Sequence, residues 1–330
     1  MSTDTANTTV AADQPNTPIS FPDADSRGDE MHDHLETWAN ELTDLTDEAQ
    51  ASTEFREWLD VHARFHDYSY RNTLLIKAQK PDARKVAGFW TWQNEFDRHV
   101  QKGEDAIWIW APIITEQCPE CGNSESYHDR EHVDCTNHET GDPDTWSEGV
   151  VGFKPTSVFD ISQTEGEPLP ELDTETDAGN VDDPTALREL LLDVSDDVGV
   201  DANVIAPADW THGNARGVCK RTNPYSCNRL VEVRDRDNDA DLCRTLLHEY
   251  AHARLHFELN DDENPDERSK REVEAESVAY LVARHLGLNP ENSKFYLATW
   301  QDDDADTIQD RLDRITTVAG EFINAIEPDR

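Results

Sequence analysis

The stretch TLLHEYAHARLH at residues 245–256 constrains the fold more than any other part of the chain. His248 and His252 are four residues apart, so an α-helix would place both imidazoles on one face, one turn apart. Leucine, alanine and tyrosine residues surround the two histidines, which is typical of a helix packed inside a core. The alternative interpretation is a solvated helix with ordinary histidines, because five residues with three fixed positions also occur by chance.

The following segment offers a third ligand from a second helix. Residues 267–286 have helical periodicity and follow a polar loop, DDENP, that allows an antiparallel return. Two imidazoles and one carboxylate can bind a tetrahedral ion and leave one position open. We predict that Glu272 is this ligand and that Glu276, one turn further along the same face, orients a histidine. The reverse assignment remains open, and Glu274 is expected to face solvent.

Glu249 follows the first histidine of the pair. Its carboxylate would lie beside the open coordination position and accept a proton from metal-bound water, as in the H-E-x-x-H arrangement of zinc peptidases. The sequence therefore predicts a catalytic Zn²⁺ ion that activates water for attack on a peptide bond, with Glu249 as general base. His256 is expected to lie in the core or behind the ligands. The side chains that would stabilise an oxyanion are Tyr225, His256 or Tyr280.

A polar insert at residues 116–146 contains a second group of metal-binding residue types. Two close pairs, C-x2-C and C-x2-H, are separated by thirteen residues, which is the pattern of a closed structural zinc site. Such a site holds a coreless segment together because metal binding is coupled to folding; unpaired surface cysteines are the alternative. The predicted ligands are Cys118, Cys121, Cys135 and His138, with His128 or His132 as alternative fourth ligands. The remaining cysteines, Cys219, Cys227 and Cys243, are expected to be ordinary thiols.

The segment at residues 64–102 is locally basic and rich in aromatic residues. It has eight Lys and Arg residues against four acids, in a chain of net charge -42. Basic side chains can follow phosphates while aromatic rings stack on unpaired bases, which predicts single-stranded-DNA binding. The alternative is an amphipathic core with a few surface lysines. The candidate contacts are Tyr68, Tyr70, Arg71, Lys77, Lys80, Lys85, Trp90, Trp92, Arg98 and Lys102.

The acidic excess of the chain has two interpretations. The sequence has 71 Asp and Glu against 29 Lys and Arg, which suits either a disordered, solvating chain or a folded halophilic protein. Nine Trp, ten Phe and seven Tyr in patterned segments favour the folded alternative, and screening lengths of about 3 Å near 1 M salt would damp the self-repulsion. No apolar run approaches the ~20 residues of a membrane span, and no signal peptide is recognisable. We expect a soluble cytoplasmic protein with no membrane partner.

Periodicity predicts an α+β protein. The N-terminal part would combine helices with a small antiparallel sheet, and the C-terminal part would be a mainly helical, zincin-like metallopeptidase domain with a short sheet. The strand at 229–233 would be an edge strand that pairs with an extended peptide. Predicted helices lie at 31–66, 70–80, 87–96, 185–198, 239–258, 267–286 and 303–326, and predicted strands at 106–113, 150–153, 157–161, 203–206, 216–220 and 229–233. The expected domains are a disordered tail at 1–30, a DNA-binding domain at 31–162, an acidic linker at 163–183 and a metallopeptidase domain at 184–330.

Two segments carry a family resemblance. Residues 245–256, followed by EVEAESVAYLV, resemble the ImmA/IrrE-like metallopeptidases and, more closely, the C-terminal domain of ArdC-type antirestriction proteins, here of haloarchaeal type. YSYRNTLLIKAQKPDARKVAGFWTW, VQKGEDAIWIWAP and VFDISQT resemble the N-terminal single-stranded-DNA-binding domain of the same family. This chain has Asp97 before Arg98, where the family usually has glycine. The resemblance implies zinc on His248, His252 and Glu272.

Two functions follow from these features. The first is a zinc-dependent endopeptidase-like protein with a single-stranded-DNA-binding module and an unknown peptide substrate. The alternative is a DNA-binding antirestriction or DNA-protection protein whose metal site is structural or conditionally active. A nuclease is poorly matched, because one H-E-x-x-H site without an aspartate cluster does not suit two-metal phosphoryl transfer.

Overall fold

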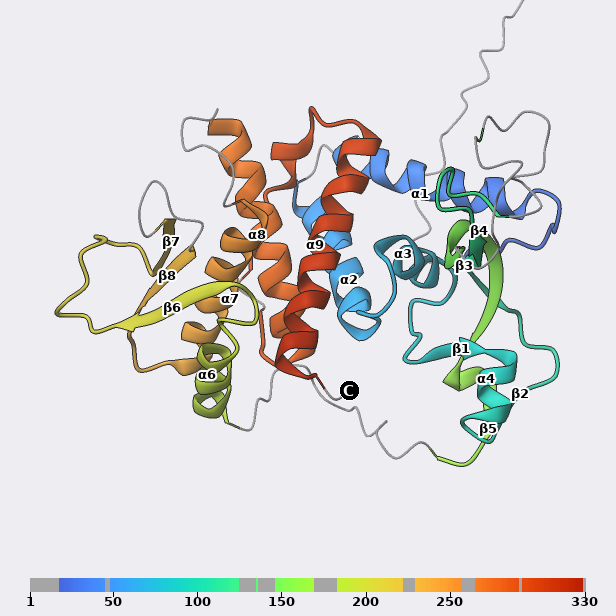
Figure 1. Ribbon diagram of the computed structural model, residues 1–330, viewed down its shortest axis with the longest axis horizontal. Helices are drawn as coiled ribbons and strands as arrows, with labels where there is room; N and C mark the ends of the chain where they lie inside the picture. Colours follow the sequence, from blue (N-terminus) through green and yellow to red (C-terminus); the bar gives the residue numbers. More distant parts are fainter. Residues whose placement is uncertain are drawn as a thin grey trace, which may run out of the picture.

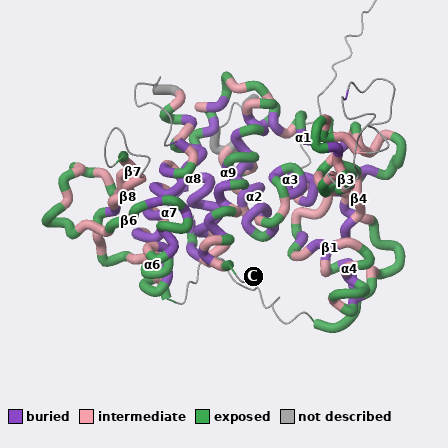
Figure 2. Tube along the Cα trace, in the orientation of Figure 1, coloured by how far each residue is buried: buried purple, intermediate pink, exposed green. Residues whose placement is uncertain are grey.

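The computed structural model describes residues 18–44, 48–124, 135, 146–168, 183–221, 229–256, 265–290 and 293–328. Helices occupy the middle of the molecule, and a small sheet lies at each end (Figure 1). The predicted α+β class is confirmed. The most deeply buried segments belong to the central helices, whereas the sheets have more exposed surface (Figure 2).

Three helices form the centre of the fold: α7 (Asp239–Leu255), α8 (Pro265–His285) and α9 (Ala305–Ile326). Helix α9 has apolar residues three or four positions apart, so one face is buried along its whole length. Asp304 caps its first turn by accepting a hydrogen bond from the Thr307 amide. Asn238 caps α7 in the same way through the Asp241 amide. Local capping therefore explains where α7 and α9 begin, and amphipathicity explains which face α9 buries.

The N-terminal helices belong to the same core. These are α1 (Arg27–Asp44), α2 (Glu48–Arg64) and α3 (Tyr70–Gln79). Phe55 of α2 packs edge-on against Phe295 and Trp300, with ring centroids 5.4 and 5.7 Å apart. Tyr280 of α8 donates a hydrogen bond to Asp60 of α2. One hydrophobic cluster contains residues of α1 and α2 as well as α7, α8 and α9, so it lies on both sides of the predicted boundary at 163–183. A second, smaller cluster lies between α2, α3 and the strands β1, β3 and β4.

The chain joins this core earlier than predicted. Phe21 and Met31 are buried, and the Arg27 guanidinium donates to the Phe21 carbonyl and lies 3.6 Å from the Trp108 ring centroid. The prediction of a disordered tail is therefore wrong for residues 18–30. The physical reason is that one phenylalanine, placed before a helix, anchors a segment whose composition is otherwise that of a tail.

The first sheet has the order β1-β4-β3 and is antiparallel throughout. β1 (Val86–Gly88) and α4 (Phe89–Asn94) replace the helix predicted at 87–96. β3 (Ile107–Gln117) and β4 (Ser147–Asp160) form one long hairpin with a register shift at Ile113/Ile114, so the two strands predicted at 150–153 and 157–161 are one. The turn η3 (Ile161–Gln163) follows β4.

A two-stranded ladder, β2 (Arg98–Val100) with β5 (Thr164–Gly166), follows a turn at Asp97. Asp97 has φ 51°, in the left-handed region that glycine adopts without strain. Arg98 pairs with Gly166, where an added Cβ would lie 2.6 Å from the Asp97 carbonyl oxygen. The position before Arg98, where the resemblance implies glycine, thus has a left-handed backbone conformation, which Asp97 adopts here.

The second sheet has the order β6-β8-β7. β8 (Arg229–Arg234) pairs in parallel with β6 (Val200–Ile205) and antiparallel with β7 (Gly217–Arg221). The prediction that the strand at 229–233 is an edge strand is therefore wrong. Its alternating pattern shows one buried face but does not show how many neighbours it has.

Two short helices complete the described fold. α6 (Pro184–Asp193) begins with a proline after the capping residue Asp183 and ends five residues before the predicted end at 198. η4 (Leu297–Trp300) is a 3-10 turn before α9. Among the helices in the ranges given above, none has the length and apolar character needed to cross a membrane.

Candidate metal centre

His248 and His252 on α7 and Glu272 on α8 meet at one point. Their ligand atoms lie within 4.8 Å of one another. The two Nε2 atoms are 3.1 Å apart, and Glu272 Oε2 is 3.5 Å from each of them. The helical spacing of four residues brings the imidazoles together, and the antiparallel return of α8 supplies the carboxylate.

The donor set fits a divalent metal ion. Two imidazole nitrogens and one carboxylate oxygen are the ligands that leave one position of a tetrahedral ion open. Glu272 is half-exposed, whereas both histidines are mostly covered, so the centre is accessible from the glutamate side. Borderline ligands of this kind suit Zn²⁺ and also other transition metals.

Glu276 lies behind His248 rather than in the centre. Its Oε2 is 3.1 Å from His248 Nδ1, the ring nitrogen that faces away from the other ligands. Arg244 lies 3.9 Å from the other oxygen of Glu276 and donates to the Ser293 hydroxyl. Glu272 is thus the carboxylate that reaches both Nε2 atoms, whereas Glu276 meets Nδ1 of His248.

Glu274 does not face solvent, and that prediction is wrong. Its side chain is only 1% exposed and lies between α7 and α9. It is 2.7 Å from His256 Nε2 and accepts hydrogen bonds from Arg311 at 2.6 Å and Arg314 at 2.7 Å. The helix angle correctly put Glu274 opposite Glu272, but α9 covers that side of α8.

Glu249 is buried beside the two histidines and against β7. Burial raises the pKa of its carboxyl group to about 7. The charge of His248 lowers this pKa by a smaller amount, and the charge of Glu272 raises it by less still. Gly217 of β7 passes so close that an added Cβ would lie 2.7 Å from Glu249 Cγ. A carboxyl group with a pKa near neutrality can both accept and return a proton.

The charges at the centre depend on one another. Burial lowers the pKa of His248, but hydrogen bonds to Glu272 and Glu276 outweigh burial and raise it to about 10. Hydrogen bonds from His248 and His252 hold the pKa of Glu272 well below its usual range. These carboxylates stabilise positive charge at this point of the fold, which is the condition that a bound cation needs.

The three candidate oxyanion stabilisers lie elsewhere or are already engaged. Tyr280 donates its hydroxyl proton to Asp60 of α2. His256 lies behind His252, 3.2 Å from its Nδ1. Tyr225 is outside the described residues. The geometry therefore assigns no oxyanion role to Tyr280 or His256.

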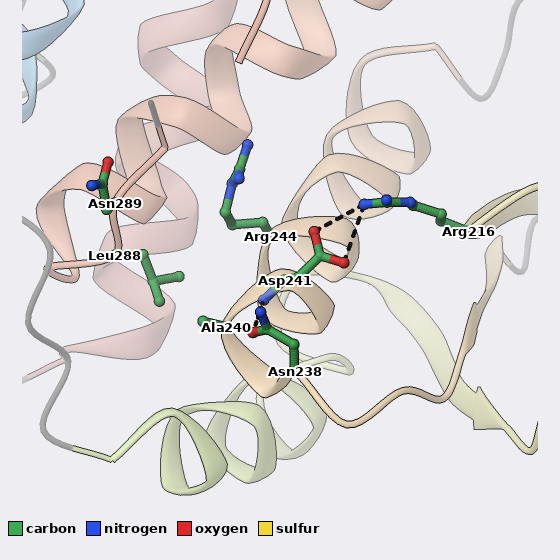
Figure 3. Close-up of a pocket in the computed structure, with 7 residues that line it drawn as sticks. All are labelled: Arg216, Asn238, Ala240, Asp241, Arg244, Leu288 and Asn289. Atoms are coloured by element: carbon green, nitrogen blue, oxygen red, sulfur yellow. Dashed lines mark hydrogen bonds and ion pairs between the residues drawn. The ribbon is translucent and has the colours of Figure 1, made fainter. Parts of the chain in front are cut away.

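A cavity of about 610 Å³ runs along the first turns of α7 (Figure 3). Arg216 lines this cavity, and its Nη1 donates to both carboxylate oxygens of Asp241, at 3.0 and 3.1 Å. Arg244 connects this cavity with the centre, because it also approaches Glu276. The cavity lining is Arg216, Asn238, Ala240, Asp241, Arg244, Leu288 and Asn289.

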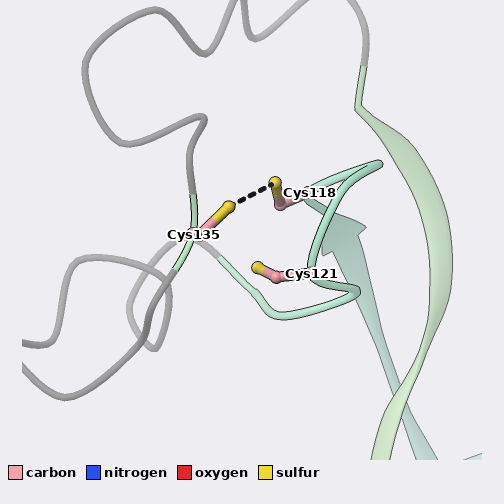
Figure 4. A group of neighbouring side chains, drawn as sticks. All are labelled: Cys118, Cys121 and Cys135. Carbon is pink, nitrogen blue, oxygen red and sulfur yellow. Dashed lines mark hydrogen bonds between the residues drawn. The ribbon is translucent and has the colours of Figure 1, made fainter.

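Three cysteines form a second cluster at the end of β3 (Figure 4). The sulfurs of Cys118, Cys121 and Cys135 lie within 4.8 Å of one another, with Cys118 and Cys135 3.7 Å apart. A tight turn closes this cluster through Gly122, whose amide donates to the Cys118 carbonyl. His138, His128 and His132, the predicted fourth ligands, are outside the described residues.

The other cysteines differ from this cluster. Burial raises the pKa of the Cys219 and Cys243 thiols to about 12, so both are unreactive at neutral pH. Cys227 is outside the described residues. No group of metal-binding side chains other than these two was found within the described ranges.

The prediction that Tyr70, Trp92 and Arg98 contact DNA is wrong, because all three are buried. Tyr70 donates its hydroxyl proton to Gln309 of α9. The Trp92 indole donates to the Phe159 carbonyl. Arg98 donates to the side chain and the carbonyl of Thr164 across the β2–β5 ladder. These side chains hold the fold together instead.

The other predicted DNA contacts remain at or near the surface. Trp90 is 67% exposed, and Arg71 and Lys102 are exposed. Lys85 is half-buried, with its ammonium group 4.8 Å from the Phe96 ring centroid. Two lysines are paired with local acids, Lys77 with Glu57 and Lys80 with Asp82, and Tyr68 donates to a backbone carbonyl.

The fold and the site together define an α+β protein with a His-His-Glu candidate metal centre between its central helices and with three small sheets among the described residues. No family model matches the sequence. Uncharacterized protein pXO2-81 of Bacillus anthracis is 27% identical over 311 residues, which cover 87% of this chain and 50% of that protein. The chain thus spans about half the length of this curated relative.

Two solved structures align with most of the chain. They are the metal-free and the Mn(II)-bound crystal structures of the antirestriction protein ArdC from plasmid R388. Both have a TM-score of 0.44, with 17% and 15% sequence identity. Each alignment covers 79% of this chain and 85% of the solved chain.

Proposed function

We propose that the chain is a divalent-metal-dependent hydrolase with a metallopeptidase-type centre, combined with a surface that binds single-stranded DNA. The observation that carries the proposal is the convergence of His248, His252 and Glu272, with ligand atoms within 4.8 Å, beside the buried carboxyl group of Glu249. A solvated helix with ordinary histidines gives no reason for a glutamate from another helix to meet both imidazoles.

Each side chain has a defined role in this proposal. His248 and His252 would hold the ion through Nε2, and Glu272 through a carboxylate oxygen. When bound, the ion would polarise the scissile carbonyl group and lower the pKa of water. Glu249 would accept the proton of the attacking water and pass it to the leaving amine, which suits a carboxyl pKa of about 7.

The DNA-binding part of the proposal rests on exposed aromatic rings. Phe89 and Trp90 on α4 are exposed and lie edge-to-face, 5.3 Å apart. Neighbouring exposed apolar side chains, unlike single ones, can mark a site that contacts a partner. Unpaired bases stack on such rings irrespective of sequence, and Lys85 precedes this helix in the chain.

The second candidate function is antirestriction or DNA protection. The solved ArdC structures are of an antirestriction protein. For this chain we propose the same function as the alternative. The exposed rings of Phe89 and Trp90 are the observation in this molecule that favours it. In this alternative the metal centre would be structural or active only under particular conditions.

Replacement of Glu249 by Gln separates the two candidates. Glu249→Gln keeps the side-chain volume and leaves all three metal ligands in place, but removes the proton acceptor. Peptide hydrolysis would be measured on casein and on a mixed peptide library, in molar KCl with Zn²⁺ or Mn²⁺, with and without single-stranded DNA. Glu36→Gln, at an exposed site on α1, is the matched control.

The proposal expects hydrolysis by wild type and Glu36→Gln, and a loss of about 10²-fold or more in Glu249→Gln. Metal content and DNA binding would be unchanged in all three proteins. If wild type hydrolyses nothing and Glu249→Gln protects DNA from restriction as well as wild type does, the second candidate replaces the first.

A second metal site is part of the proposal. We propose that Cys118, Cys121, Cys135 and His138 bind a structural Zn²⁺, because the three sulfurs already converge at a tight turn. All four positions of that ion would be filled, so it would support folding rather than catalysis.

A further inference from the structure

His252 has a hydrogen-bonding chain behind it that His248 lacks. The Nδ1 atom of His252 lies 3.2 Å from Nδ1 of His256. The other nitrogen of His256, Nε2, lies 2.7 Å from Oε2 of Glu274. His248, by contrast, meets the carboxylate of Glu276 directly. The Nδ1 atoms of both histidines therefore lead to a glutamate on α8, that of His248 directly and that of His252 through a second imidazole.

The proton positions along this chain follow from one requirement. To bind a metal ion through Nε2, His252 needs a free electron pair on that atom. The proton of its neutral ring must therefore be on Nδ1. Nδ1 of His252 then donates, and Nδ1 of His256 must accept. The proton of neutral His256 is consequently on Nε2, where it is donated to Glu274. Only this sequence of donors and acceptors satisfies every contact and leaves His252 able to bind metal.

Helix α9 keeps the final acceptor charged. Arg311 and Arg314 both donate to Oε1 of Glu274, at 2.6 and 2.7 Å. Arg311 is itself held by Asp303, at 2.8 Å. Glu274 and His256 are both buried, so water does not compete for these contacts. A carboxylate paired with two guanidinium groups remains an acceptor, and it therefore imposes the proton order on both imidazoles.

We propose that His256 and Glu274 are positioning residues that fix the ring orientation and tautomer of His252 for metal binding. Arg311 and Arg314 anchor this chain from α9. The inference rests on the proposed function, because it requires an ion at His248, His252 and Glu272. It adds two residues outside the centre that control its affinity for metal, and outer contacts of this kind change metal affinity by about 10- to 100-fold.

Two substitutions at one position test the inference. In His256→Gln the amide oxygen can accept from His252 Nδ1 while the amide nitrogen donates to Glu274, so the proton order is kept. In His256→Leu neither contact is possible. Zinc affinity would be measured by competition with a chromophoric chelator, on the full chain in molar KCl. We expect His256→Leu to bind Zn²⁺ about 10- to 100-fold more weakly and His256→Gln to bind it nearly as well as wild type.

His62→Leu is the matched control for the loss of a buried imidazole. His62 lies on α2 and contacts Thr73 of α3, not the centre. We expect this variant to unfold at lower temperature without a change in zinc affinity. Thermal unfolding of every variant without metal separates a loss of stability from a loss of metal binding.

Nitrogen-15 NMR of the imidazoles in zinc-loaded wild type gives a test without substitution. We expect the proton of His252 on Nδ1 and that of His256 on Nε2. A His256 ring with its proton on Nδ1 would overturn the inference, as would equal zinc affinity in wild type and His256→Leu, or equal loss in the Leu and Gln variants. If wild type and His248→Ala bind zinc equally at this centre, the proposed function is overturned as well. Failure of the inference alone therefore differs from failure of the proposed function.

Discussion

Gly217 sets the space available to Glu249. A Cβ at this position would lie 2.7 Å from Cγ of Glu249 and 2.8 Å from Cγ2 of Thr245, closer than side chains approach one another. Both residues belong to α7. Because the β-branched Thr245 has little rotational freedom, the longer Glu249 side chain is the group expected to move. The role of Gly217 is therefore steric rather than conformational.

Gly217→Ala should separate chemistry from metal binding. We expect hydrolysis to fall by about 100-fold, since a displacement of the base of about 1 Å has effects of this size. The zinc content should remain that of wild type, because no ligand contacts Gly217. Gly320→Ala is the control, as its Cβ meets no atom within 4 Å. Unchanged hydrolysis in Gly217→Ala would show that Glu249 is not the base.

His62 is a buried imidazole that burial, assisted by the nearby His66, keeps neutral by lowering its pKa to about 3. Thr73 donates to the Tyr70 carbonyl, so its oxygen accepts from His62 Nδ1. The proton is therefore on Nδ1, and Nε2 has no hydrogen-bond partner. Protonation of His62 would leave a buried charge without a counterion.

This burial gives stability a defined pH dependence. The unfolded chain binds a proton at His62 below pH ~6.5, whereas the folded protein does not until about pH 3. Stability is therefore lost as the pH falls from 6.5 towards 3, by about 1.4 kcal/mol per pH unit. Between pH 6.5 and 5, urea unfolding of wild type should lose about 2 kcal/mol more than that of His62→Gln. Equal losses in the two proteins would contradict this.

At the scale of elements, the β3–β4 hairpin leads into the cysteine cluster. β3 ends at Gln117, and Cys118 begins the turn that brings the sulfurs together. The hairpin has no helix of its own beyond this point among the described residues. A bound ion would therefore contribute most of the local stability there.

Metal analysis of dialysed protein should count the two sites separately. Wild type is expected to retain two equivalents of zinc, and Cys118→Ala and His248→Ala one each. Only Cys118→Ala should shift the thermal unfolding of the hairpin region strongly, because the cysteine site is the one proposed to be structural. A single equivalent in wild type that survives Cys118→Ala would exclude the structural site.

The exposed aromatic rings of α4 offer a binding interaction, base stacking, that depends little on salt. Phosphate contacts release counterions and lose strength steeply with salt, whereas base stacking contributes roughly 1–3 kcal/mol per base and is less sensitive. In molar KCl, Trp90→Ala should therefore weaken binding of an oligothymidylate about tenfold or more, and Lys85→Ala much less. Fluorescence anisotropy at several KCl concentrations measures both. The opposite order at high salt would reject a stacking surface at α4.

The acidic excess acts on the whole molecule. A net charge of -42 on 330 residues produces self-repulsion that destabilises the compact state. Salt screens this repulsion at distances beyond about 3 Å near 1 M. The thermal midpoint should therefore rise steadily from 0.1 M to molar KCl. Sucrose in place of KCl should give a smaller rise, because it does not screen charge. A midpoint independent of salt would argue against a halophilic protein.

The sequence predicted α7, α8 and α9 well because their apolar repeats and caps are local. It also predicted which face of α7 carries the histidines, since helical spacing determines it. It did not predict that α9 covers Glu274, because periodicity identifies a buried face but not its neighbour. One signal was available: Arg311 occupies an apolar position of the α9 repeat and is buried, and a buried arginine requires an acidic partner.

The strand order and the shared core could not be predicted from the sequence either, because both depend on contacts between distant residues. Pairing of Phe55 with Phe295 joins residues 240 positions apart in the chain, and no local pattern records such a pair. Nor does the pattern of β8 show that it has two neighbours. Gly217 carried no signal at all, because its importance arises only from the passage of β7 beside α7.

The contact of α2 with α8 limits how this chain can be divided into fragments. Asp60 accepts a hydrogen bond from Tyr280 on the helix that carries Glu272, and Phe55 packs on Phe295, whose ring also contacts Tyr280. A chain cut between residues 168 and 183 would leave Phe295, Trp300 and their neighbours without a cover, and the C-terminal fragment would aggregate rather than retain a working centre. We therefore expect a working centre only where both parts of the chain are produced together.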